Sequence, residues 1–299
     1  MSPAVIASKR LLRPAWLPTD IWPFEPVALH VDGTAVAVSE AGRGPALLFY
    51  TGIGSFVWRD VMLELSRDFR CVTLDPPGIG LSAPVSRAGA TLQLSARAVE
   101  ATIQAFDLRD LALVVHDTGG PPAFAAAVRL PERIRGLVGV NTFAWRPSGP
   151  AFRGMLAVMG SGLMRQISLT TGALSRVTST GFGVGRHLDD TSRRGYRMGL
   201  QKSMGAFHDY LHDARDSDVY DEIARGFEGT LRRLPLLTIF GERNDPLKFQ
   251  PRWKALFPDA RQLLVPKGNH FPMCDAPDFD AKQIRKWHGE HVGRAEDRS

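Results

Sequence analysis

A chain of 299 residues with 44% hydrophobic and 23% charged residues has the composition of an ordinary globular protein that buries a large core. Disordered, collagen-like and coiled-coil proteins are therefore poor fits. The formal net charge of +6 comes mainly from arginines scattered along the chain without a long basic run, which argues against a nucleic-acid partner.

Cysteine usage and apolar runs bear on the compartment. Cys71 and Cys274 are the only cysteines, too few for a disulfide framework or a zinc site, so a reducing, cytoplasmic setting fits best. The apolar stretch 11–22 is broken by Pro14 and Pro18, and no other run approaches the length of a membrane span. We therefore expect no membrane partner.

The elements predicted along the chain begin with a β-hairpin at 27–40, whose two alternating strands meet at Asp32-Gly33. Short apolar runs then alternate with helix-length segments, and such runs are typical of strands buried on both faces of a parallel sheet. The predicted strands are 46–50, 71–74, 111–116, 135–141, 236–240 and 261–265, and the predicted helices are 56–66, 92–106, 121–130, 249–257 and 279–288.

One long segment, 143–233, breaks this alternation because it shows helical periodicity but no convincing buried strand. A helical cap inserted after the sixth predicted strand is the simplest account. Ligands of open α/β sheets bind beyond the carboxyl ends of the strands, where such an insertion can cover them. We thus expect a core domain in two parts, 1–142 and 234–299, and a cap at 143–233.

The strand 111–116 runs into a tight turn, Asp117-Thr118-Gly119-Gly120, and then into an alanine-rich helix. This is the shape of a nucleophile elbow, with Asp117 as the projecting residue at the head of the helix. An aspartate here also serves as a helix N-cap, and that alternative remains open. A serine elbow of the form Gly-x-Ser-x-Gly is absent, which argues against a serine esterase.

A carboxylate nucleophile forms an ester that water must clear, and this requires a base held in the right tautomer. Asp245 follows the strand 236–240, and His270 lies in the Gly-Asn-His-Phe-Pro loop after the strand 261–265. The order nucleophile, acid, histidine is that of α/β-hydrolases. The turn after the strand 46–50 adds a backbone amide at Ile53, which together with that of Thr118 forms the predicted oxyanion hole.

Taken together, these residues resemble the haloalkane dehalogenase and epoxide hydrolase branch of the α/β-hydrolase superfamily. The likeness runs from about Trp22 to Trp287. It rests on Trp22-Pro23-Phe24-Glu25-Pro26, Val31-Asp32-Gly33, Val57-Trp58-Arg59, Asp75-Pro76-Pro77-Gly78-Ile79-Gly80-Leu81-Ser82, His116-Asp117-Thr118-Gly119-Gly120, Asn141-Thr142-Phe143-Ala144-Trp145 and Gly268-Asn269-His270.

The sequence departs from both subfamilies. Haloalkane dehalogenases usually carry tryptophan after the nucleophile and an asparagine, or a second tryptophan in the cap, as halide donors, whereas this chain has Thr118 and Ile53 at those positions. Epoxide hydrolases use cap tyrosines, and Tyr196, Tyr210 and Tyr220 lie in the predicted cap. They also usually keep a His-Gly-x-Pro turn, which 51–54 does not match.

The resemblance implies that Asp117 displaces a leaving group to form an alkyl ester, which His270, oriented by Asp245, helps water to hydrolyse. Trp145, Tyr196 and Tyr210 are the expected substrate-binding residues, and neither a metal nor a cofactor is expected. The partners would be a small apolar organic substrate and water. The alternatives are an epoxide hydrolase and a catalytically silent binding protein with the same fold.

Overall fold

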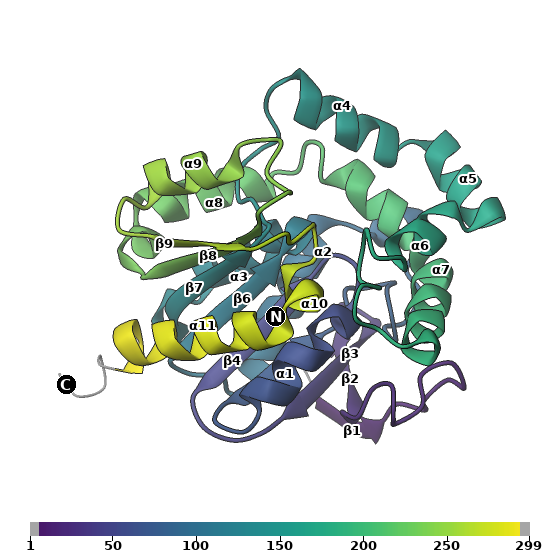
Figure 1. Cartoon of the computed structure of the whole chain (residues 1–299), viewed down its shortest axis with the longest axis horizontal. Coiled ribbons are helices and arrows are strands. Elements are labelled where there is room, and N and C mark those ends of the chain that lie inside the picture. The colour runs from purple at the N-terminus through teal and green to yellow at the C-terminus, as the bar shows by residue number, and fades with distance from the viewer. Residues whose placement is uncertain (1–5, 294–299) are drawn as a thin grey trace.

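One twisted sheet crosses the molecule, with helices on both of its faces (Figure 1). The computed structural model describes residues 6–293 and gives the nine strands the order β1-β2-β3-β5-β4-β6-β7-β8-β9. The strands are β1 Ile6–Arg10, β2 Pro26–Val31, β3 Thr34–Ala41, β4 Ala46–Thr51, β5 Arg70–Leu74, β6 Leu111–His116, β7 Ile134–Val140, β8 Leu236–Gly241 and β9 Arg261–Val265.

The antiparallel edge confirms the predicted hairpin. β2 pairs with β3 across a turn in which Asp32 has φ 48° and Gly33 has φ 79°, as a two-residue hairpin loop with positive φ at both positions requires. β1 was not predicted. Its Ile-Ala-Ser-Lys-Arg sequence lacks the apolar alternation of a half-buried strand. The segment is a strand because its backbone pairs with β2, which the sequence pattern does not indicate.

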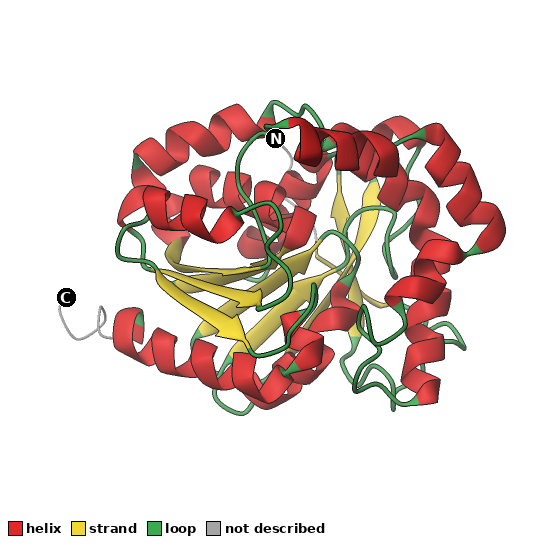
Figure 2. Ribbon diagram, turned by 45° about the horizontal axis from the view of Figure 1, so that its top comes forward, coloured by secondary structure: helices red, strands yellow, loops and turns green. Residues whose placement is uncertain are grey.

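From β5 to β9 the sheet is parallel, and β4, β6 and β8 are buried along their whole length, as their continuous apolar runs predict. The helices α1, α10 and α11 lie on one face, and α2, α3 and α9 lie on the other (Figure 2). Their bounds are α1 Arg59–Leu65, α2 Leu92–Ala105, α3 Gly120–Arg129, α9 Phe249–Leu256, α10 Pro272–Asp275 and α11 Pro277–His291.

The helical insertion follows β7, which is the sixth of the predicted strands because β1 adds one to the count. Its helices are α4 Pro150–Met159, α5 Gly162–Thr171, α6 Ala173–Thr178, α7 Asp190–Asp213 and α8 Val219–Glu228. α4 to α7 form an arc beyond the carboxyl ends of the strands (Figure 1). α8 lies within the range predicted for the cap but packs on α3 of the core, where Glu222 accepts a 2.8 Å hydrogen bond from Arg129.

Cys71 and Cys274 are buried free thiols. Within residues 6–293, every helix is too short or too polar to cross a bilayer.

Candidate active site

The predicted nucleophile, Asp117, stands in a strained turn directly after β6. Its φ is 49°, a conformation that residues other than glycine rarely adopt and that marks strained functional turns. Gly119 permits the turn, since a Cβ there would lie only 2.5 Å from the Thr51 Cα. The Thr142 hydroxyl donates a 2.6 Å hydrogen bond to the Asp117 carbonyl and so fixes the turn from β7. The side chain of Asp117 remains one quarter exposed and faces the cavity described below.

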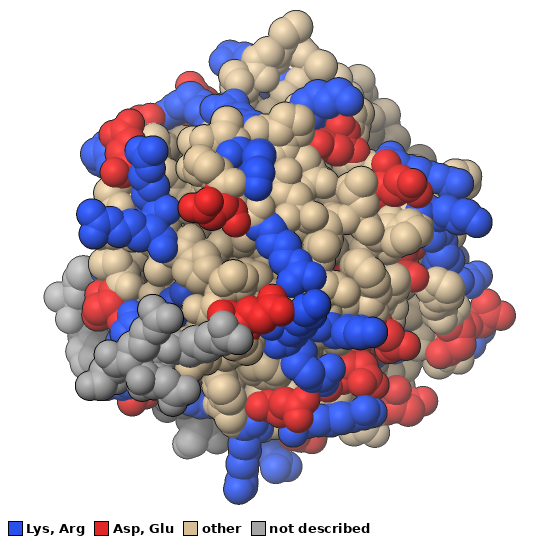
Figure 3. Space-filling model, turned by 60° about the vertical axis from the view of Figure 1, so that its left-hand side comes forward, with Lys and Arg blue, Asp and Glu red and all other residues tan. Residues whose placement is uncertain are grey.

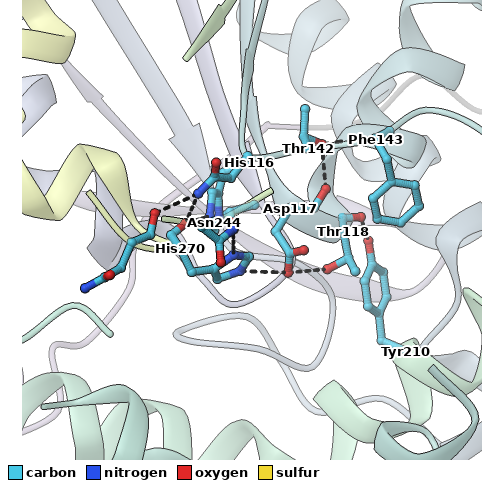
Figure 4. Close-up of polar contacts among 11 residues, drawn as sticks. His116, Asp117, Thr118, Thr142, Phe143, Tyr210, Asn244 and His270 are labelled. Carbon is cyan, nitrogen blue, oxygen red and sulfur yellow. Dashed lines mark hydrogen bonds and ion pairs between the residues drawn. The ribbon is translucent and has the colours of Figure 1, made fainter. Parts of the chain in front are cut away.

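His270 lies opposite this carboxylate, with its Nε2 3.7 Å from the Asp117 Oδ2 (Figure 4). Burial tends to raise the pKa of Asp117, but the His270 charge and hydrogen bond, His116 and the Thr118 amide together lower the pKa below the ordinary value. Asp117 is therefore ionised at neutral pH, as a nucleophilic carboxylate must be.

The residue against the other ring nitrogen of His270 is Asn244. Its carboxamide nitrogen lies 3.2 Å from the Nδ1. A carboxamide can turn its oxygen to this position, accept from Nδ1–H and leave Nε2 unprotonated, which is the tautomer a general base requires. The sequence predicts Asp245 in this role, and the structure places its neighbour there.

Asp245 makes different contacts. Its carboxylate accepts hydrogen bonds from the backbone amides of Phe249 at 2.6 Å and Gln250 at 3.1 Å, in the first turn of α9. Free amides at a helix start attract a carboxylate because they have no partner within the helix. Asp245 also lines the cavity, but its two oxygens are committed to α9.

Asn244→Ala is expected to lower turnover by about tenfold to a hundredfold, because the His270 ring loses the group that holds its orientation. Asn244→Asp should retain activity, because a carboxylate accepts from Nδ1–H as the carboxamide oxygen does. Asp245→Asn should retain most activity and lower the unfolding free energy by about 1 kcal/mol, as expected for a weakened helix cap. Collapse of activity in Asp245→Asn alone would restore Asp245 as the orienting residue.

Two residues that the sequence analysis did not select, His116 and Asn141, hold the loop of His270. His116 Nε2 lies 2.9 Å from the His270 carbonyl, and Nδ1 lies 3.1 Å from the Thr51 hydroxyl. A carbonyl only accepts, so Nε2 carries the hydrogen and Nδ1 accepts from Thr51. Asn141 donates to the same carbonyl at 2.8 Å. A histidine at the end of an otherwise apolar strand was the available signal.

His116 is fully buried, and burial together with the nearby His270 lowers its pKa to about 3. In the unfolded chain its pKa is about 6.5, so only the unfolded state takes up this proton between the two values. The contribution of the neutral ring to the free energy of unfolding is therefore fully present above pH 6.5. It declines as the pH falls toward 3, by about 1.4 kcal/mol per pH unit.

His116→Gln, which cannot titrate, should remove this slope. Urea unfolding of wild type and variant at several pH values between 7 and 4 would measure it. Parallel stability curves would contradict the assignment of a buried neutral ring.

The candidate oxyanion donors lie at the same cavity wall, which Ile53 and Thr118 both line. Thr118 is buried and its backbone amide is close enough to the Asp117 carboxylate to lower the pKa of that group. The two residues come from the turns after β4 and β6, which are neighbours in the sheet. Both residues therefore border the cavity, and their part as oxyanion donors stays a prediction.

A cavity of about 280 Å³ lies above these residues. Four of its polar groups, Asp117, Asn141, Asn244 and His270, come from the carboxyl ends of β6, β7, β8 and β9, and Thr118, Thr178, Tyr196 and Asp245 also line it. The rest of the lining is mostly apolar and includes Phe143, Phe152, Leu156, Leu200, Phe207 and Phe240. No lysine or arginine of the described part of the chain, 6–293, lines it. The cavity suits a small uncharged organic molecule.

Of the three residues expected to bind substrate, only Tyr196 lines this cavity. Its hydroxyl is buried and makes no hydrogen bond of good geometry among the described residues. Burial raises its pKa, which the nearby Thr178 side chain lowers only in part, so the hydroxyl stays protonated. Tyr210 donates a 2.6 Å hydrogen bond to the Thr118 carbonyl and lies outside the lining (Figure 4). Trp145 is also outside it and packs against Trp253 and Phe249.

No cluster of three or more metal-ligating side chains occurs within residues 6–293. The polar groups that face each other across the cavity are a carboxylate, that of Asp117, and an imidazole, that of His270. A family model described as the alpha/beta hydrolase fold matches residues 45–277.

The chain belongs to the α/β-hydrolase family. This α/β-hydrolase is 27% identical over 274 residues to haloalkane dehalogenase 2 of Mycobacterium tuberculosis, an alignment that covers 88% of this chain and 95% of the relative. The predicted resemblance and fold class are thereby confirmed, and the protein is a hydrolase.

Solved structures of two kinds share this α/β-hydrolase fold. A loop variant of a haloalkane dehalogenase from Bradyrhizobium elkanii gives a TM-score of 0.76 at 20% identity and covers 92% of this chain and 100% of its own. A Vigna radiata epoxide hydrolase variant gives 0.75 at 19% identity, with 89% and 99% covered. At these identities the likeness shows the fold alone.

Proposed function

We propose that this chain hydrolyses a small apolar organic substrate through an alkyl ester on Asp117, in the manner of a haloalkane dehalogenase. The observation that carries the proposal is an ionised carboxylate at a strained elbow, 3.7 Å from an imidazole nitrogen, at the floor of an apolar cavity. The reducing cytoplasm is the proposed setting, in keeping with two buried free thiols.

In the first step, an Asp117 oxygen attacks a saturated carbon from the side opposite the leaving group. A carbon–oxygen bond forms as the carbon–halogen bond breaks, and the halide leaves with the bonding electron pair. The apolar lining raises the reactivity of the carboxylate, because few water molecules solvate its charge. The product is a neutral alkyl ester on Asp117.

In the second step, water attacks the carbonyl carbon of this ester while His270 takes its proton. The amides of Ile53 and Thr118 stabilise the negative oxygen of the tetrahedral intermediate. Collapse releases an alcohol and restores the Asp117 carboxylate, and His270 then returns its proton to solvent. The sum is alkyl halide plus water giving alcohol, halide and a proton.

The departing halide is poorly stabilised in this reaction, because Thr118 and Ile53 stand where the resemblance implies side-chain N–H donors. Loss of one anion-stabilising donor typically costs about 3 kcal/mol, or a hundredfold or more in rate. We therefore expect slow turnover of chloroalkanes and better turnover of bromoalkanes, whose leaving group needs less stabilisation.

Epoxide hydrolysis is the second candidate, and Tyr196 is the observation that favours it. Opening an epoxide requires a proton at the departing oxygen, and a protonated phenol that lacks another partner is a suitable donor. Tyr210 and Tyr220 are not available, since both hydroxyls donate to backbone carbonyls. An epoxide route in this cavity would therefore depend on a single tyrosine.

Tyr196→Phe distinguishes the two reactions. If the substrate is an epoxide, the variant should lose about a hundredfold or more in turnover, because the proton donor is gone. If it is a bromoalkane, the loss should be within a few fold. Tyr210→Phe is the matched control, whose hydroxyl contacts a backbone carbonyl and not the cavity.

The direct test is a panel of bromoalkanes, chloroalkanes, epoxides and activated esters, with halide and diol measured separately. Halide release from bromoalkanes supports the first candidate, and diol formation supports the second. Absence of turnover across the panel, with no ester trapped on Asp117, would favour a silent binding protein.

A further inference from the structure

The cap segment from α4 to the turn after α6 carries a concentration of exposed apolar side chains. Seven of the eleven large hydrophobic residues found exposed in the described chain fall between residues 155 and 182. Single exposed apolar residues are ordinary, but a concentration of them marks an interaction site. We define the apolar cap face by Met155, Val158, Leu163, Ile167, Val177 and Phe182, whose exposed fractions run from 38% to 83%.

The charge of this segment is of one sign. Residues 147–188 contain four arginines and no aspartate or glutamate. Arg165 and Arg186 have ion-pair partners in Asp209 and Asp275, at 3.2 and 3.5 Å. The other two arginines, Arg153 and Arg176, are exposed, and no ion pair within residues 6–293 involves them. Arg153 lines a surface hollow with Asp213 at the end of α7 and Asp216 just after it, whereas Arg176 does not line this hollow. The face of the molecule in Figure 3, by contrast, intersperses acidic and basic residues.

We propose that the apolar cap face docks on the surface of an anionic lipid bilayer and takes up apolar substrate from it. A segment that combines exposed apolar side chains with arginines and contains no acidic residue of its own has the composition of segments that lie in a membrane interface. This departs from the expectation of no membrane partner, and it concerns contact with a bilayer surface, not a span.

The position of the helices supports this partner. α4 and α5 lie along the outer rim of the cap, away from the sheet (Figure 1). The same helix α4 lines the active-site cavity with Phe152, Leu156 and Met159. Met155 belongs to both surfaces, since it lines the cavity and is 47% exposed. Apolar side chains therefore continue from the outer cap face to the cavity.

A second copy of the chain is the competing occupant, and charge disfavours it. A two-fold interface sets the same patch of both copies face to face. The acid-free segment would then place Arg153 and Arg176 of both copies in one interface without acidic partners of its own. A phosphate-bearing lipid surface instead supplies the opposite charge.

The substrate part of this inference rests on the proposed function, but the docking part does not. Vesicle flotation tests docking without any turnover. Wild type should bind vesicles of phosphatidylcholine and phosphatidylglycerol, more weakly in high salt, and bind phosphatidylcholine alone poorly. Failure to bind the anionic vesicles would overturn the inference.

Variants identify the surface. Leu163→Asp with Phe182→Asp should lower vesicle partitioning by about tenfold or more, because two large apolar groups no longer enter the interface. Leu12→Asp with Leu264→Asp is the matched control on the core, at 95% and 51% exposure. Arg153→Gln with Arg176→Gln should weaken binding to anionic vesicles, and exposed Arg43→Gln on the core should not. Equal losses in test and control pairs would refute the assignment of this face.

Two further measurements separate the remaining outcomes. Analytical ultracentrifugation of wild type and the Leu163/Phe182 variant should show the same monomeric mass, and a dimer that only the variant dissociates would assign the face to a second copy instead. Release of bromide from a water-soluble bromoalkane should be unchanged in the variant, since neither residue lines the cavity. Vesicle binding without turnover of any substrate would overturn the proposed function and leave the docking surface standing.

Discussion

Asp117→Asn is expected to abolish turnover, by about ten-thousandfold or more, as loss of a covalent nucleophile does in other enzymes. The amide is nearly isosteric with the carboxylate and, of the neutral side chains, asparagine best tolerates the positive φ of this turn. The fold should therefore persist, so that loss of activity reports on chemistry. Asp117→Ala removes the risk that a deamidated asparagine restores the nucleophile.

The control for this prediction is Asp245→Asn, a carboxylate-to-amide change in the same cavity at a residue committed to α9. Thermal unfolding and circular dichroism of both variants establish whether the elbow still folds. Activity of folded Asp117→Asn and Asp117→Ala within about tenfold of wild type would remove Asp117 from the nucleophile position. The remaining alternative for this residue would then be a purely structural one at the start of α3.

The elbow and the histidine loop could be predicted from the sequence because each follows an apolar strand. The carboxyl ends of all parallel strands lie at one edge of a sheet, so the turns that hold Asp117 and His270 are expected at the same edge, although β7 and β8 separate β6 from β9. The roles of the residues in the turn after β8 are harder to predict from the sequence. Asn244 and Asp245 are adjacent, and their separate roles depend on where α9 begins, because its free amides draw the Asp245 carboxylate and leave Asn244 beside His270.

The residues of the cap show a second limit of prediction from the sequence. Periodicity indicates which helical positions are apolar, but it does not tell which neighbour each position meets. Tyr210 reaches the Thr118 carbonyl of the core, whereas Tyr196, on the same helix, faces the cavity. Trp145 similarly packs among aromatic residues near α9. Such choices are fixed by how α7 and the segment after β7 rest on the core, which no local pattern encodes.

His270→Gln is expected to stop the reaction halfway, with the substrate bound to Asp117 as an ester. Displacement requires only the ionised carboxylate, whereas hydrolysis requires a base to deprotonate water. Glutamine retains a hydrogen-bond donor but has no basic nitrogen. One equivalent of bromide per enzyme should appear in a burst, and steady turnover should fall by about a thousandfold or more.

The experiment is best performed above neutral pH. The His270 charge and hydrogen bond help to lower the pKa of Asp117, while burial acts in the opposite direction. Removing the imidazole therefore shifts the pKa of Asp117 upward, and a larger fraction of the carboxyl is protonated and unreactive near neutrality. Alkylation of the variant should accordingly become faster as pH rises through the new pKa of Asp117.

Intact-protein mass spectrometry then distinguishes the two candidate substrates. A bromoalkane loses its halogen on reaction, so the protein gains the mass of the alkyl group less one hydrogen. An epoxide opens without loss of atoms, so the protein gains the mass of the whole epoxide. Peptide mapping should place either adduct on Asp117, and Asp117→Asn combined with His270→Gln should show none. Steady turnover by the single variant without an adduct would mean that water attacks the substrate directly, and that Asp117 acts as a base or a charge instead of a nucleophile.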